Sequence, residues 1–240
     1  MAGHSKWANI KHRKGKQDAA RGNVFTKIGR EIAVAVKNGG ADPTGNYRLR
    51  DAIAKAKQHN MPNDNIARSI KKASGELGSI NYEEITYEGY ALGGVAVIVE
   101  TLTDNKNRTA GEMRHLFDKF GAGLGTAGCV SFMFKRKGVV VVQKSGLTED
   151  DMMMLALESG ADDFVDVGEA YEIYTAFGEV FNVSKALENA GLAILSQENM
   201  LIADNYIDAG DKIESIEKLL NALEDNDDVQ NVYHNCRFYL

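Results

Sequence analysis

The sequence predicts an α+β protein: an N-terminal three-helix domain followed by two ferredoxin-like-type α+β domains, the last inserted into the middle one. Three observations support this fold class. Apolar residues recur every three or four positions up to Gly75, and from Ile80 onward they form short strand-like runs. The order of elements over residues 135–199 is β-α-β-β-α-β, which is typical of a ferredoxin-like domain. Charge is also divided along the chain, which indicates domains with different partners.

Three amphipathic helices are expected in the first domain. The first begins near Asn23 and ends at Lys37-Asn38, where Gly39-Gly40 stops it, and Asp42-Pro43 is expected to cap the second. Asn63 or Asp64 caps the third, which ends at Gly75. The residues expected to face the core are Phe25, Ile28, Ile32, Val36, Leu49, Ile53, Ala56, Ile66, Ile70 and Ala73.

The middle domain is expected to begin with a hairpin. Residues 85–90 and 95–102 predict two strands joined by a turn at 92–94. Thr109 and Glu112 form a capping box for a helix, and residues 130–134 predict another strand.

The next stretch predicts a complete ferredoxin-like unit. Thr148 caps its first helix, which ends at Gly160, and Met152, Met153 and Met154 are expected to fill the core beneath that helix. The remaining elements are strands at 139–142, 163–167, 170–176 and 193–196 and a helix at 179–190.

The C-terminal elements have no core of their own. They are a strand near 200–206, a helix through Ile213 and Leu223, and a strand near 229–233. Joined to the hairpin and its helix, they would complete a second sheet. We therefore expect a helical domain at 1–79, a discontinuous middle domain at 80–134 with 200–240, and an inserted domain at 135–199.

Composition limits the classes of protein. At 240 residues the chain is long enough for two or three domains. Cys129 and Cys236 form no CxxC pair, so neither a disulfide framework nor a zinc site is expected. The polar, basic start is unlike a secretory signal and no apolar run could span a bilayer. We expect a soluble cytoplasmic protein that does not act at a membrane.

Charge is the most informative feature of the composition. Residues 1–75 contain 16 Lys and Arg against five Asp and Glu, a net charge of +11. Residues 145–240 contain four against 21, a net charge of −17. Such a division favours a basic domain that meets a polyanion, and acidic domains available to protein partners.

The candidate nucleic-acid contacts lie on the basic N-terminal arm and on the helices that follow it. Each Lys or Arg that meets a phosphate releases counterions, so a cluster of this size favours nucleic acid over a merely solvated face. Trp7 could stack on an exposed base, or it could pack the arm against the helices. The candidates are Lys6, Trp7, Lys11, His12, Arg13, Lys14, Lys16, Lys27, Arg30, Arg48, Lys55, Arg68, Lys71 and Lys72.

Two further motifs have a functional and a structural interpretation. Residues 123–128 match GxGxxG, but they follow a helix and precede a strand, the reverse of the dinucleotide-binding order. Their glycines predict a loop that approaches another backbone closely. In a factor that works on a ribosome, such a loop could be a probe, and its candidate residues are Gly121, Gly123, Gly125 and Gly128. Lys106 and Arg108 lie where a helix begins, which predicts an anion site or ordinary capping.

The chain resembles the YebC family, also called PmpR-type regulators. The resemblance rests on the opening MAGHSKWANIKHRK, on Tyr87-Glu-Gly-Tyr, on residues 103–109 and on the glycine-rich stretch before Val130. It covers essentially the whole chain. It implies a helical domain followed by two α+β domains, and a DNA-binding transcriptional regulator. Relatives in mitochondria activate translation, and the family is also linked to ribosomes stalled at proline-rich sequence.

No constellation of residues predicts catalysis. The five histidines show no metal-ligand spacing, and we expect no enzyme activity, metal or cofactor. Two hypotheses remain open: a DNA-binding regulator of transcription, and a translation factor that binds ribosomal RNA or the ribosome. A basic arm suits DNA and RNA equally, and no helix shows a base-reading pattern, which favours contacts with the backbone.

Overall fold

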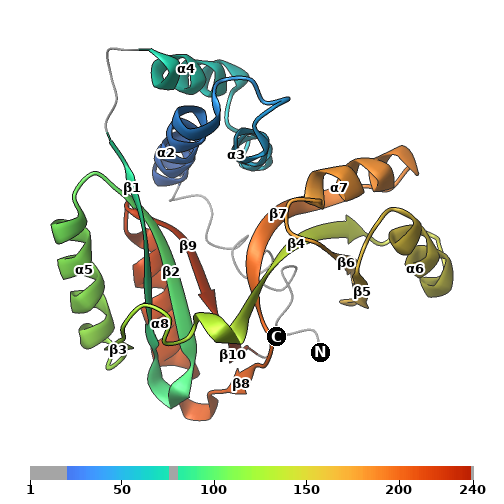
Figure 1. The fold of residues 1–240 in the computed structure, drawn as a ribbon. Coiled ribbons are helices and arrows are strands. Elements are labelled where there is room, and N and C mark those ends of the chain that lie inside the picture. Colours follow the sequence, from blue (N-terminus) through green and yellow to red (C-terminus); the bar gives the residue numbers. More distant parts are fainter. Residues whose placement is uncertain (1–20, 76–80, 239–240) are drawn as a thin grey trace. The chain divides into compact units, whose positions relative to one another are not determined.

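The computed structural model describes residues 21–75 and 81–238. It divides into two compact units, one formed by residues 136–202 and the other by the described residues up to Lys135 together with 203–238. Helices precede mixed sheets and helices, as Figure 1 shows, so the predicted α+β class is confirmed. No helix within the described residues is long and apolar enough to cross a membrane.

The three N-terminal helices are α2 (Arg21–Gly39), α3 (Tyr47–Gln58) and α4 (Asn63–Ser74). Every residue predicted to face their core is buried or packs against it at half-burial. The predicted cap of α3 is wrong. Asp42 instead accepts hydrogen bonds from the amide and hydroxyl of Thr44, and Asn46 caps the helix by accepting from the Leu49 amide. The Asn46 amide also donates to the Ala35 carbonyl, so it joins α2 to α3.

The middle sheet has the strand order β3-β1-β2-β9. Strands β1 (Glu83–Tyr90) and β2 (Ala96–Thr103) form the predicted hairpin, and β9 (Val229–His234) pairs antiparallel with β2. Helix α5 (Lys106–Lys119) leads from β2 to the short β3 (Gly123–Leu124), which pairs on the other side of β1. This arrangement is a split βαβ unit.

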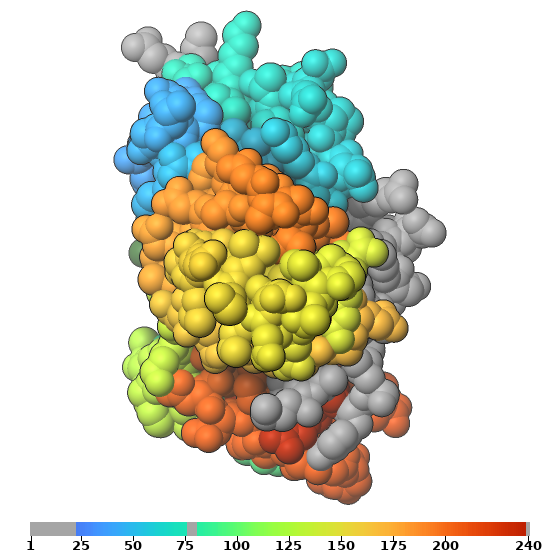
Figure 2. Space-filling model, turned by 90° about the vertical axis from the view of Figure 1, so that its right-hand side faces the viewer, coloured from blue at the N-terminus to red at the C-terminus, as the bar shows by residue number. Residues whose placement is uncertain are grey.

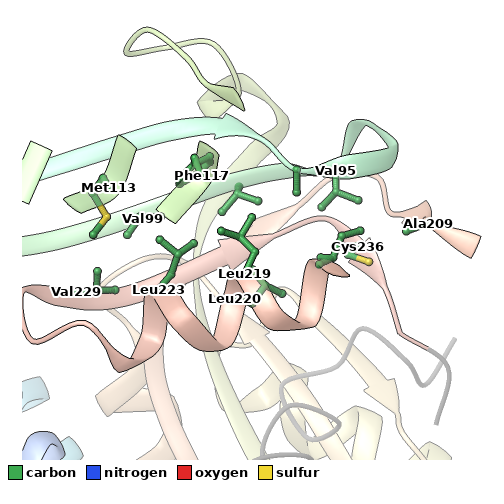
Figure 3. Close-up of a cluster of buried hydrophobic side chains, with 13 residues drawn as sticks. Val95, Val99, Met113, Phe117, Ala209, Leu219, Leu220, Leu223, Val229 and Cys236 are labelled. Carbon is green, nitrogen blue, oxygen red and sulfur yellow. The ribbon is translucent and has the colours of Figure 1, made fainter. Parts of the chain in front are cut away.

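Helices α5 and α8 (Ile213–Asp225) cover one face of this sheet. Figure 3 shows Leu219 and Leu223 of α8 beside Val99 of β2, with Phe117 of α5 in the same cluster. The core therefore joins segments that lie more than a hundred residues apart. Beside it, β8 (Ile207–Asp208) pairs in parallel with β10 (Cys236–Arg237).

Two boundaries in this domain differ from the prediction. Helix α5 begins three residues before Thr109, because Asn105 caps it by accepting from the Arg108 amide. Thr109 is buried within the helix rather than capping it. The strand predicted at 130–134 is wrong, because Ser131–Met133 form a 3-10 turn and β4 (Phe134–Gln143) begins after it.

The second unit has the sheet order β5-β6-β4-β7, which is the ferredoxin-like order. Its strands beyond β4 are β5 (Asp163–Asp166), β6 (Ala170–Thr175) and β7 (Ile194–Ala203). Helices α6 (Glu149–Glu158) and α7 (Val180–Asn189) pack on one face, and Thr148 caps α6 as predicted. The two strands predicted at 193–196 and 200–206 are one continuous strand, β7.

The expectation for the three methionines is wrong for two of them. Met152 is fully buried, whereas Met153 and Met154 are 43% and 60% exposed. One turn of a helix can aim only one of three consecutive side chains at the sheet, so the other two point outward.

Candidate nucleic-acid interface

The outward face of α4 presents three exposed basic residues. Ile66, Ile70 and Ala73 face the bundle core, which leaves positions 68, 71 and 72 on the solvent side. Arg68, Lys71 and Lys72 are exposed, and no acidic side chain in the described part of the chain pairs with them. Residues three and four apart are neighbours on a helix, so the three charges form one cluster.

The other predicted contacts that lie on the described helices are engaged within the protein. Lys27 donates to the Glu224 carbonyl at 2.6 Å, and burial lowers its pKa despite nearby acids. Lys55 pairs with Glu31 at 2.5 Å, and Arg48 pairs with Glu84. These cations are therefore less available to phosphates than those of α4. Lys57, near the end of α3, is a further exposed base that is not among the predicted contacts.

Arg30 forms an ion pair with the buried carboxylate of Asp228. Its guanidinium contacts Asp228 Oδ1 and the Asp227 carbonyl, each at 2.7 Å, and it lies 5.5 Å from the Tyr82 ring centroid. Only 17% of its side chain is exposed. Arg30 thus joins α2 to the start of β9.

The predicted anion site at the start of α5 is occupied by the same carboxylate. Asp228 Oδ2 accepts hydrogen bonds from Arg108 and Thr109 at 2.7 Å each and from Thr103 at 3.1 Å. Arg108 also pairs with Asp104. Lys106 is exposed on the first turn. The protein itself therefore supplies an anion to the positive end of this helix.

The electrostatics of this cluster keep Asp228 charged. Burial pushes its pKa upward, but hydrogen bonds from Arg108, Thr109 and Arg30 outweigh burial and hold the pKa below its usual value. The Asp228 carboxylate likewise raises the pKa of Arg108. The sequence predicts an anion site here but not its occupant, because the cluster joins three segments far apart in the chain: Arg30, residues 103–109 and Asp228.

The glycine-rich loop is built around a second buried carboxylate. Glu88 of β1 accepts hydrogen bonds from the backbone amides of Gly128, Val130 and Ser131 at 2.8–2.9 Å. Burial raises the Glu88 pKa, but these amides outweigh it and the net pKa is lowered. The loop is thus held to the strand through its backbone.

The four loop glycines have different surroundings. Gly121 and Gly128 have positive φ, which favours glycine, whereas a Cβ on Gly123 would meet no atom within 4 Å. A Cβ on Gly125 would lie 2.5 Å from Cys129 Sγ. The predicted close backbone approach occurs on the neighbouring strand, where a Cβ on Gly89 would lie 2.3 Å from the Gly123 carbonyl oxygen.

The candidates on the N-terminal arm, from Lys6 to Lys16 and including Trp7, lie outside the described residues. Among the residues that the structure does describe, no three His, Cys, Asp or Glu gather where they could hold a metal ion. Burial raises the pKa of both thiols, that of Cys236 to about 11.

Known families, sequences and one solved structure are similar to this chain over nearly its whole length. Residues 5–76 match the model of the TACO1/YebC protein N-terminal domain, and residues 82–236 match that of the TACO1/YebC second and third domain. A "probable transcriptional regulatory protein" from Acetivibrio thermocellus is 59% identical over 98% of both chains, and one from Pelotomaculum thermopropionicum is 53% identical over 98% of both. The crystal structure of a conserved hypothetical protein from Aquifex aeolicus is 46% identical, with a TM-score of 0.84 over 97% of each chain.

Proposed function

This chain belongs to the TACO1/YebC family, and from that premise we propose that it is a non-catalytic regulator of gene expression that grips nucleic acid by its phosphates. The names of its relatives favour DNA and control of transcription. The observation that carries the proposal is the cluster of Arg68, Lys71 and Lys72 on α4, exposed while neighbouring cations are engaged.

A helix face of Lys and Arg suits the phosphate backbone better than base edges. Lysine acts as a point charge, and each one bound to a phosphate releases condensed counterions. We therefore expect binding that tolerates sequence and falls steeply with salt. The N-terminal arm, with five Lys and Arg before residue 20, would add contacts of the same kind.

The experiment is a salt titration of duplex DNA binding by the full chain and by the double variant Lys71→Ala/Lys72→Ala. The slope of log K against log salt should flatten by up to about 1.8, from roughly 0.9 per lost phosphate contact. Affinity should fall by a similar factor for unrelated sequences.

The matched control is Lys212→Ala/Lys218→Ala, which removes the same charge from exposed lysines near α8. Equal slopes for the two double variants would mean that net charge alone governs binding and that α4 is no interface. A loss confined to some DNA sequences would mean that α4 reads bases.

Ribosomal RNA is the alternative target, because the same face fits its phosphates. Crosslinking in cells followed by sequencing of both bound DNA and bound RNA separates the two. Enrichment of ribosomal RNA that disappears in the α4 variant, without enrichment of DNA, would favour a translation factor.

A further inference from the structure

The outward face of α6 is apolar where a solvated helix would be polar. Met152 and Ala156 point into the core, and the opposite side carries Met153, Met154 and Leu157. The last of these is 54% exposed. Figure 2 shows α6, in yellow, at the surface of its unit.

Acidic residues frame this apolar face. On a helix, Asp150 lies one turn before Met153 and Met154, and Glu158 lies one turn after Met154. Neither has an ion-pair partner among the described residues, and α6 itself contains no Lys or Arg. The whole unit, residues 136–202, contains four Lys and Arg against 12 Asp and Glu, a net charge of −8.

We propose that the outward face of α6 docks a basic amphipathic segment of another protein. Methionine is flexible and polarisable, so two adjacent exposed methionines suit an apolar partner surface whose shape is not fixed in advance. The flanking carboxylates add attraction for Lys and Arg and repel acidic partners.

Charge complementarity favours a basic segment of another protein over a second copy of this chain and over nucleic acid. A second copy docking through the same face in a two-fold dimer would bring Asp150 and Glu158 against their own equivalents. Nucleic acid is repelled by a unit of this charge. The proposal is independent of phosphate binding by α4, because it uses different residues in a different unit.

The test uses the full chain labelled with ¹³C at the methionine methyl groups. The probe is an 18-residue Leu-Lys helix with its leucines on one face, compared with a scrambled isomer of equal composition. The Met153 and Met154 methyl signals should shift on addition of the probe, whereas that of buried Met152 should not. The scrambled isomer should bind at least tenfold more weakly.

Two comparisons between variants separate the apolar from the electrostatic contribution to binding. Met153→Ser/Met154→Ser/Leu157→Ser should weaken binding at least tenfold, while Leu195→Ser, at an exposed residue of β7, should not. Glu158→Gln should weaken binding more than Glu188→Gln, which removes an exposed charge from α7. Equal binding of the amphipathic and the scrambled peptide would overturn the proposal. So would an equal loss of peptide binding by the two variants of either comparison.

The natural partner is identified by a photo-crosslinker at position 154 in cells, with position 188 as the control site. The proposal expects crosslinks, specific to position 154, to a basic segment with apolar side chains in another protein. Crosslinks to this chain's own residues 1–22, to a second copy of α6 or to nucleic acid would overturn it, as would an absence of crosslinks specific to position 154.

Discussion

Asp228 is a buried carboxylate whose environment keeps it ionised. It is 3% exposed and accepts hydrogen bonds from two arginines and two threonines. Arg30 reaches it from α2 and Arg108 reaches it from α5. A buried charge of this kind stabilises the fold only while its partners are in place, because Asp228 or Arg30 left alone would be desolvated without compensation.

Replacing Asp228 by Asn should lower the free energy of unfolding at pH 7 by about 3 kcal/mol, because the mostly buried Arg30 loses its counter-charge, whereas Arg108 keeps its ion pair with Asp104. The folded pKa of Asp228 is depressed, so its stabilisation is present above the unfolded pKa of about 4 and is lost as the pH falls through the folded pKa. Denaturant titrations of both proteins between pH 3 and pH 7 measure this.

The difference between wild type and Asp228→Asn should be constant above about pH 5 and shrink below pH 4. The control is Asp225→Asn, at an exposed residue that ends α8, which should change stability little at any pH. A constant difference down to pH 3 would mean that the carboxylate charge contributes nothing.

At the scale of elements, the glycine-rich loop depends on the strand beside it. The loop is attached through its amides to Glu88 and through β3 to β1. Because Gly89 has no side chain, the Gly123 carbonyl oxygen and the Phe117 ring lie close to its Cα. The close approach thus requires glycine on β1, outside the predicted motif.

Gly89→Ala should destabilise the protein by about 1–3 kcal/mol, because the added methyl meets a backbone oxygen and a packed ring that cannot both move. Gly123→Ala is the control and should leave thermal unfolding nearly unchanged, since open space surrounds its Cβ position. Similar melting temperatures for the two variants would contradict this account. If Gly123→Ala keeps its stability but impairs cellular function, the candidate probe role of the loop gains support.

At the scale of the whole molecule, the unit formed by residues 136–202 is attached at two neighbouring points. The Asp204 amide donates to the Met133 carbonyl at 2.9 Å, and Lys135 pairs with Asp204 at 2.8 Å. The core of the middle sheet contains no residue between 136 and 202. The middle sheet therefore has the contacts that it needs without that unit.

Replacing residues 136–202 by a short Gly-Ser linker should leave the remainder folded, as measured by circular dichroism and limited proteolysis. Removing a net charge of −8 should also tighten non-specific DNA binding, most clearly at low salt, where the charge is least screened. The control is a full chain carrying Asp162→Asn and Asp163→Asn, which should tighten binding by less. An unfolded deletion variant would show that the two units share a core.

Features that depend on residues close together in the chain could be predicted from the sequence. Helical periodicity located the inward residues of α2, α3 and α4. The cap at Thr148 was identified because an N-cap residue directly precedes its helix and accepts from the amide three residues on. The fold class followed from the order of such elements. The division of charge also predicts which part of the chain meets a polyanion.

Which cations are engaged within the protein and which carboxylates are buried could be learned only from the folded chain. Arg30 and Asp228 lie 198 positions apart, and Glu88 reaches amides 40 to 43 positions away, so no local pattern contains these contacts. The exposure of Met153 and Met154 was equally hidden, because composition marks them as apolar but only packing decides which neighbour faces the sheet. Local periodicity fixes the faces of an element, whereas the partner of each face is set by contacts between distant segments.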